Sequence, residues 1–248
     1  MFSLLIYCLA LGAIGTALIQ QKKIMAKKYK IVGFKDKLTA KESESILENH
    51  GIKIKKYLPL ANACLCLVDE KTTSFKSLAA DTEVEFIEDD YMAQIQVIPS
   101  TSGAYLYKIK SQSIPWGINK IEAPGVWKRC NGEGIKVGII DTGIDRSHPD
   151  LKDNIKEAYG VMDSKKTDDD NGHGTHVAGT IAALDNNIGV VGVAPKAEIF
   201  SVKAFDEKGR GQVSDIIDAL NWCVEEQVHV INMSFGFNIK SRALERAI

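Results

Sequence analysis

Short apolar segments alternate with helical segments in the second half of the chain, and this pattern restricts the fold more than any other feature. Apolar runs at 135–140, 198–204 and 228–233 predict buried strands, and the segments 174–184 and 213–226 have helical spacing. Such an alternation is typical of a mostly parallel sheet with helices on both faces. We therefore expect an α/β fold in which ligands bind beyond the carboxyl ends of the strands.

The first part of the chain predicts a smaller unit of its own. Strands are predicted at 29–34, 52–57, 63–68 and 84–87, and helices at 39–51 and 73–78. The spacing Thr39-Ala-Lys-Glu42 is that of a capping box at the start of the first helix, and Gly51 suits its end. The order strand, helix, strand, strand, helix, strand indicates a small α+β domain of the ferredoxin-like kind.

The composition argues against two classes of function. The 248 residues carry a net charge of −1, so the sequence gives no sign of a surface for nucleic acid. The five cysteines have no C-x-x-C spacing, which indicates neither a zinc site nor a disulfide framework. We interpret Cys64, Cys66 and Cys223 as small core residues.

The first 19 residues are almost wholly apolar, a length that suits a signal peptide or a membrane anchor. Lysines follow this run and none precedes it, a distribution that favours a cytoplasmic location for the downstream chain. Translation from Met25, which would omit the segment, is a third possibility. We expect residues 1–25 to be a signal or anchor segment and the protein to be secreted, with the membrane contacted only through this segment.

Two residues are candidates for acid–base chemistry. Asp141 ends the first apolar run of the second half, and His173 begins a helix whose following residues are small. Small residues let this helix pack closely against the sheet, which would hold the imidazole in a fixed orientation. Histidine is the natural general base near neutral pH. An aspartate that accepts a hydrogen bond from the other ring nitrogen would fix the tautomer.

Simpler interpretations of these residues remain open at this point. Asp141 and Gly143 are equally consistent with a turn that ends a strand. His173 and His176 could bind a metal from one face of a helix, although no H-E-x-x-H motif and no third ligand nearby support this.

Four motifs in one order resemble the subtilisin family of serine proteases. They are Ile140-Asp-Thr-Gly-Ile-Asp145, His148-Pro-Asp-Leu151, His173-Gly-Thr-His-Val-Ala-Gly-Thr180 and Val230-Ile-Asn-Met-Ser234. The resemblance implies that residues 112–248 are the N-terminal part of a subtilisin-like peptidase domain, with polypeptides as substrates. Residues 27–95 resemble the propeptide of these enzymes, an intramolecular inhibitor and folding chaperone, and residues 96–111 would be the linker and processing region.

The resemblance also implies roles for individual residues. Asp141 and His173 match the aspartate and histidine of the catalytic triad, and His176 matches a structural histidine. Two segments match the edges that bind the substrate backbone as an added strand. Their residues are Ser234, Phe235 and Gly236 in one segment, and Gly209 and Gly211 in the other.

A structural calcium ion is a further implication of the resemblance. The loop 184–190 is similar to the calcium loop of the family. The matching ligands are the carbonyl groups of Leu184, Ile188 and Val190 and the side chains of Gln112, Asp150 and Asn186. Such an all-oxygen set suits a hard cation of the size of calcium.

Two departures from the family pattern affect the prediction. No Gly-Thr-Ser and no G-x-S-x-G motif occurs before the chain ends at Ile248. We therefore expect the nucleophilic serine and the oxyanion-hole asparagine to lie beyond this end, and the 248 residues alone to be inactive. The alternative is an inactive truncated product whose propeptide-like domain retains inhibitor or chaperone activity. The linker is also longer than usual, so that processing after Gln96 or near Lys110 is equally consistent with it.

Overall fold

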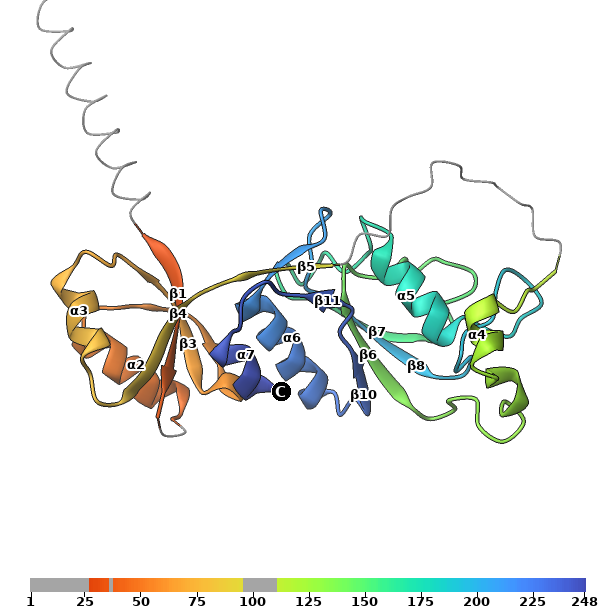
Figure 1. Cartoon of the computed structure of the whole chain (residues 1–248), viewed down its shortest axis with the longest axis horizontal. Coiled ribbons are helices and arrows are strands. Elements are labelled where there is room, and N and C mark those ends of the chain that lie inside the picture. Colours follow the sequence, from red (N-terminus) through yellow and green to blue (C-terminus); the bar gives the residue numbers. More distant parts are fainter. Residues whose placement is uncertain (1–26, 36–37, 96–110) are drawn as a thin grey trace, which may run out of the picture. The chain divides into compact units, whose positions relative to one another are not determined.

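A computed structural model describes residues 27–35, 38–95 and 111–248 (Figure 1). These residues form two compact units, the first ending at Asp90 and the second beginning at Tyr91. The apolar segment 1–25 and nearly all of the predicted linker, including Gln96 and Lys110, lie outside the described residues.

The first unit has the predicted order of elements. These are β1 (Lys28–Phe34), α2 (Ala40–Asn49), β2 (Ile54–Leu58), a 3-10 turn (Pro59–Ala61), β3 (Ala63–Val68), α3 (Thr73–Ala79) and β4 (Val84–Asp89). The strands form one antiparallel sheet in the order β2-β3-β1-β4. The predicted strand and helix ends differ from the observed ones by at most two residues.

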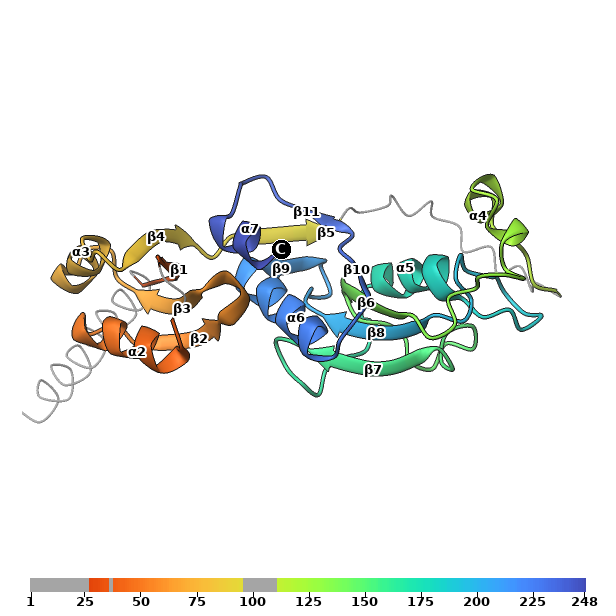
Figure 2. The ribbon, with the colours of Figure 1, turned by 90° about the horizontal axis from the view of Figure 1, so that it is seen from below.

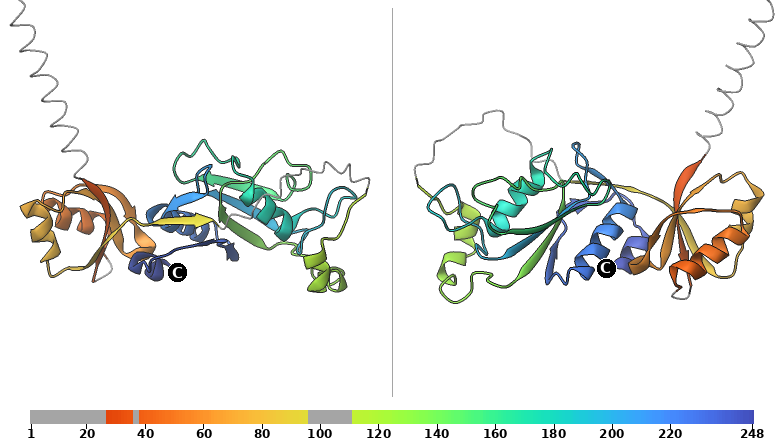
Figure 3. Two further views of the ribbon diagram at one scale, coloured as in Figure 1. Left: turned by 45° about the horizontal axis from the view of Figure 1, so that its top comes forward. Right: turned by 180° about the vertical axis from the view of Figure 1, so that it is seen from behind.

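One face of this sheet carries the core of the first unit. Alternate residues of β1 and β3, among them Val32 and Cys66, pack in one cluster with Leu47 of α2 and Leu78 of α3. Both helices therefore cover the same face (Figure 3). The capping box at the start of α2 is confirmed, since Thr39 and Glu42 exchange side-chain to backbone hydrogen bonds.

The second unit contains a parallel sheet in the order β10-β6-β8-β7 (Figure 2). Its strands are β6 (Lys136–Asp141), β7 (Ile155–Gly160), β8 (Glu198–Lys203) and β10 (Val230–Asn232). The helices are α4 (Trp116–Lys120), α5 (His173–Ala182), α6 (Val213–Glu225) and α7 (Arg242–Ala247), with a 3-10 turn at Ala123–Gly125. The predicted α/β arrangement is confirmed for this unit.

Helices cover both faces of the parallel sheet. Ala178 and Ala182 of α5 pack against Val137 and Ile139 of β6. Gly138 points the other way, and a Cβ there would lie 2.9 Å from Sγ of Cys223 on α6. Because successive residues of a strand face opposite sides, α5 and α6 lie on opposite faces. The absence of a side chain at Gly138 lets α6 approach β6.

A second, smaller sheet in this unit has three strands. The central strand is β5 (Met92–Ile95), which pairs antiparallel with both β9 (Arg210–Gln212) and β11 (Phe235–Gly236). The sequence pattern assigned residues 92–95 to the end of the first domain, whereas the structure pairs them with segments more than a hundred residues away in the chain. Figure 2 shows β5 between its two partners.

None of the helices found in the described part of the chain is long and apolar enough to cross a membrane.

Candidate active site

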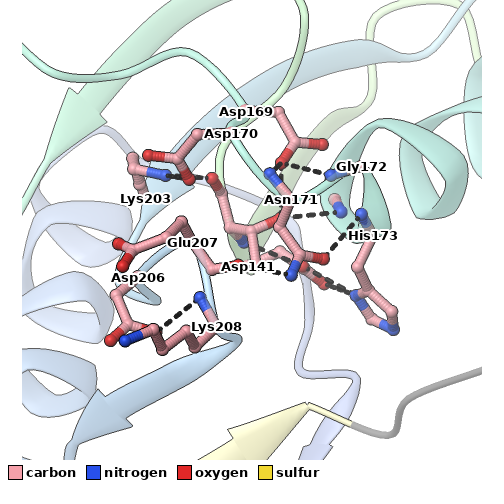
Figure 4. Close-up of polar contacts among 12 residues, drawn as sticks. Asp141, Asp169, Asp170, Asn171, Gly172, His173, Lys203, Asp206, Glu207 and Lys208 are labelled. Carbon is pink, nitrogen blue, oxygen red and sulfur yellow. Dashed lines mark hydrogen bonds and ion pairs between the residues drawn. The ribbon is translucent and has the colours of Figure 1, made fainter.

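Asp141 and His173 meet at the carboxyl end of the parallel sheet. Nδ1 of His173 lies 2.8 Å from Oδ1 and 2.9 Å from Oδ2 of Asp141 (Figure 4). The carboxylate is buried, with 1% of its side chain exposed, and the imidazole is 11% exposed. The last residue of β6 and the first residue of α5 thus form a hydrogen-bonded pair.

The environment of Asp141 fixes the role of each ring nitrogen. Burial raises the pKa of Asp141, while the hydrogen bonds from His173 and from the Thr142 amide (2.7 Å) lower it, and the net pKa is raised. The ionised carboxylate is an acceptor only, so it accepts a hydrogen bond from Nδ1–H, and the proton stays on Nδ1. The neutral imidazole then carries its lone pair on Nε2, where it can accept a proton.

Gly174 allows the close approach of α5 to β6. A Cβ at this position would lie 2.1 Å from the carbonyl oxygen of Gly143 and 3.2 Å from Cβ of Asp141. A larger residue would push the start of the helix away from the end of the strand. The expected packing of small residues after His173 is therefore found, with Gly174 making the tightest contact.

The structure adds three charged residues to this junction that the sequence did not predict. Asp169 accepts hydrogen bonds from Thr142, which follows β6, and from Thr175 of α5. Lys203 donates to the Thr142 carbonyl at 2.6 Å and pairs with Asp170 at 2.6 Å. Lys203 is only 4% exposed. A lysine at the end of an otherwise apolar strand was the one available signal in the sequence.

The residues matched to the two substrate-binding segments lie on either side of β5. Phe235 and Gly236 form β11, Gly211 lies in β9, and the carbonyl of Gly209 accepts from the Ile95 amide at 3.0 Å. Ser234 directly precedes β11, and its hydroxyl accepts from Nδ2 of Asn232 at 2.5 Å. Strand β5, an extended segment of this chain, therefore lies between β9 and β11 and pairs with both.

Comparison with known proteins bears on this arrangement. Residues 132–248 match the model of the subtilase family. Subtilisin E of Bacillus subtilis is 38% identical over 231 residues, which are 92% of this chain and 56% of that protein. Residues 132–248 therefore belong to the subtilase family.

Other members show the same relationship. Subtilisin BL of Lederbergia lenta is 49% identical over 140 residues, 56% of this chain and 51% of that protein. M-protease of Shouchella clausii is 38% identical over 218 residues, 87% of this chain and 53% of that protein. The chain spans a little over half the length of the curated relatives it matches.

Four of the six residues matched to the subtilase calcium loop are brought together. Nε2 of Gln112 lies 2.5 Å from the carbonyl oxygen of Leu184 and 3.1 Å from that of Val190. Oδ2 of Asp150 accepts from the Val190 amide at 2.9 Å. Oδ1 of Asp150 is buried and has no hydrogen-bond partner among the described residues.

The other two residues of this set, Asn186 and Ile188, contact each other within the loop. Oδ1 of Asn186 accepts from the Ile188 amide at 3.1 Å, and Ile188 is exposed. No group of three His, Cys, Asp or Glu side chains that could hold a metal occurs in the part of the chain that the structure describes. The set instead contains backbone carbonyls, one carboxylate and the amide of Gln112, which donates through Nε2 to two of those carbonyls.

Proposed function

We propose that this chain is the part of a subtilisin-type serine endopeptidase that supplies the general base, His173, and the carboxylate that orients it, Asp141. The observation that carries this proposal is the 2.8 Å contact between Nδ1 of His173 and the buried Asp141 carboxylate, at the carboxyl end of the parallel sheet. Ligands of open α/β sheets bind at this edge.

The geometry supports a two-step acyl transfer. Nε2 of His173 would take the proton of a serine hydroxyl while the serine oxygen attacks the carbonyl carbon of a peptide. The imidazolium, stabilised by Asp141, would then give that proton to the departing amine, and water would release the acyl group by the same steps. The 248 residues contain no Gly-Thr-Ser motif, so we assign the nucleophile and an oxyanion-binding asparagine to residues outside them.

The groove between β9 and β11 is the proposed substrate site. A peptide would add to this groove as an extended strand, as β5 does in the described structure. Gly209, Gly211, Ser234, Phe235 and Gly236 would provide its edges. Because β5 already occupies the groove, we assign residues 27–95 as a ferredoxin-like propeptide that inhibits the enzyme, with residues 96–111 as the processing region and 112–248 as peptidase.

The pairing of β5 with β9 and β11 also supports a second function. A chain whose residues 92–95 fill a peptide groove can act as an inhibitor or chaperone of a subtilase without any catalysis of its own. Purified chain without the nucleophile would then slow a related subtilase, and its 27–95 region would protect that enzyme from autolysis.

A calcium ion fits the loop around Asp150. The buried Oδ1 of Asp150 has no partner among the described residues. The carbonyls of Leu184 and Val190 both accept from Nε2 of Gln112, whose amide would turn over to present its oxygen to the ion. Oxygen donors with one carboxylate match the preference of calcium. We propose that these groups, with Asn186 and Ile188, hold calcium, which would supply a positive charge that fixes the loop.

Secretion is part of the same proposal. The apolar segment 1–25 would direct export, and an endopeptidase kept inactive by its own propeptide could leave the cell before it acts.

Hydrolysis of a chromogenic peptide by a protein that joins these 248 residues to the segment supplying the nucleophile tests the function. We expect His173→Ala to reduce kcat by roughly 10⁶-fold, as removal of this base does in a subtilisin. Asp168→Asn, an exposed change in the loop before α5, is the matched control and should retain activity. Undiminished hydrolysis by His173→Ala protein would refute the assignment.

A further inference from the structure

A second carboxylate, that of Asp169, connects the two elements that carry the His173–Asp141 pair. Oδ1 of Asp169 accepts from the Thr142 hydroxyl at 2.8 Å, and Oδ2 accepts from the Thr175 hydroxyl at 2.6 Å. Thr142 directly follows Asp141, and Thr175 lies in the first turn of α5, which begins at His173. One side chain on the loop before α5 therefore binds the end of the strand and the start of the helix.

Each of these hydroxyl groups also accepts a hydrogen bond from the opposite element. The amide of Gly174 in α5 donates to Oγ1 of Thr142 at 3.0 Å, and the amide of Asp145 donates to Oγ1 of Thr175 at 3.0 Å. A hydroxyl has one hydrogen, and when this points to Asp169 its lone pairs face the amides. Asp169 thereby sets the orientation of both hydroxyl groups.

Backbone amides hold Asp169 itself in place. It accepts from Asn171 at 3.0 Å and from Gly172 at 2.9 Å (Figure 4). It also accepts from the Thr175 amide at 2.9 Å. Burial raises the pKa of Asp169, but these hydrogen bonds outweigh burial, and the pKa is lowered. The group is therefore an ionised double acceptor at neutral pH, next to helix amides that favour negative charge.

We propose that Asp169 is a positioning residue for the Asp141–His173 pair, which it holds in register through Thr142 and Thr175 without contacting either side chain. The kinetic part of this inference rests on the proposed peptidase function, and the geometric part does not. Small displacements of a catalytic group reduce rate strongly, because the reacting atoms must be aligned.

Two substitutions remove the connection with little change in shape. Asp169→Asn replaces one acceptor oxygen by a donor, so that one threonine hydroxyl loses its acceptor. Thr142→Val removes the hydroxyl from the strand side, and Thr142→Ser restores it. Asp168→Asn removes the same charge from the neighbouring residue, which is exposed and for which no side-chain hydrogen bond is found among the described residues.

The experiment is ¹⁵N NMR of the histidine side chains of the full chain at alkaline pH, where the shifts report the tautomer of His173. We expect the Nδ1–H tautomer to dominate in wild type, Asp168→Asn and Thr142→Ser proteins. In Asp169→Asn and Thr142→Val proteins we expect it to fall to roughly half, because Asp141 no longer fixes the ring. Because both substitutions break the same connection, the double variant should shift the tautomer population little more than either single variant does.

Kinetics of the full-length enzyme provide a second measurement. Asp169→Asn should lower kcat by roughly 10- to 100-fold with KM unchanged. A wild-type tautomer in both variants overturns the inference. If Asp169→Asn protein does not fold, Thr142→Val decides. If a wild-type protein that also carries the nucleophile hydrolyses no peptide, the proposed function fails, while the tautomer measurement still decides the role of Asp169.

Discussion

The side chain of Ile95 lies directly against Gly209. A Cβ on Gly209 would be 2.3 Å from Cγ1 and 2.5 Å from Cδ1 of Ile95, which is 5% exposed. Gly209 has a φ of 69°, a conformation that residues with a side chain rarely adopt. The absence of a side chain at Gly209, directly before β9, therefore makes room for the side chain of Ile95 from β5.

Replacement of Gly209 by alanine should loosen β5. The added methyl group would collide with Ile95, and the positive φ adds a cost of about 1–2 kcal/mol. Hydrogen exchange of the Ile95 amide, which donates to the Gly209 carbonyl, should accelerate by roughly 10-fold or more. Gly236→Ala is the control on the other edge of β5, since a Cβ there meets nothing within 4 Å. Equal acceleration in both variants would contradict a specific role of Gly209.

Calcium should stabilise the wild-type chain through Asp150. Calcium at about 100 times its Kd adds roughly 2.7 kcal/mol to the free energy of unfolding, and we expect Tm to rise accordingly. Asp150→Asn should abolish this rise, while Asp153→Asn, an exposed carboxylate close by, should retain it. Thermal melts with calcium, with EDTA and with magnesium at equal ionic strength measure the effect. The same calcium-dependent rise in Asp150→Asn protein would remove Asp150 from the site.

Elements that depend on local pattern could be predicted from the sequence. The run at 135–140 became β6, and the helical spacing at 213–226 became α6 with one residue fewer. Cys64, Cys66 and Cys223 are fully buried core residues as interpreted, and burial raises the pKa of each thiol to about 12. In each case the signal is the periodicity or residue type of a single segment.

Features that depend on distant partners could not be predicted. β7 lies at the edge of the sheet and is half exposed, so its sequence lacks a continuous apolar run. The four residues of β5 look like the end of the first domain, and nothing in them indicates β9 or β11 as partners. Asp169 stands in a run of three aspartates, and only the folded chain distinguishes it through Thr142 and Thr175.

Acid should weaken the first unit through Asp81. Nε2 of His50 lies 2.6 Å from Oδ2 of Asp81, and Nδ1 lies 2.9 Å from Oγ of Ser77. The hydrogen bond to His50, followed by that from the Glu83 amide, lowers the pKa of Asp81 in the folded state. A lowered folded pKa stabilises the fold above the unfolded pKa of about 3.8, and this contribution is lost as the pH falls through the folded value.

Asp81→Asn protein should therefore be less stable than wild type at neutral pH, by about 0.5–1 kcal/mol, and the difference should vanish in acid. Hydrogen exchange of the β1 and β3 amides measures the stability of this unit alone. Ser77→Ala is the control, because loss of an uncharged partner should not change the dependence on pH below 4. An unchanged acid dependence in Asp81→Asn protein would show that another carboxylate is responsible.

The two glycines of α5 should respond to alanine in opposite ways. At Gly174 the methyl group would lie 2.1 Å from the carbonyl oxygen of Gly143. We therefore expect the free energy of unfolding to fall by about 1–3 kcal/mol and the His173–Asp141 contact to be disturbed. At Gly179 nothing lies within 4 Å of a Cβ, and alanine should add about 0.5–1 kcal/mol by helix propensity.

Urea unfolding followed by tryptophan fluorescence measures both effects, because all three tryptophans belong to the second unit. A lower midpoint for Gly174→Ala and a higher one for Gly179→Ala are expected. A midpoint of Gly174→Ala protein equal to that of wild type would mean that α5 can shift away from β6 without loss of stability. The Asp141–His173 distance would then not depend on the close approach at Gly174, and Asp169 with its two threonines would be the main restraint on the pair.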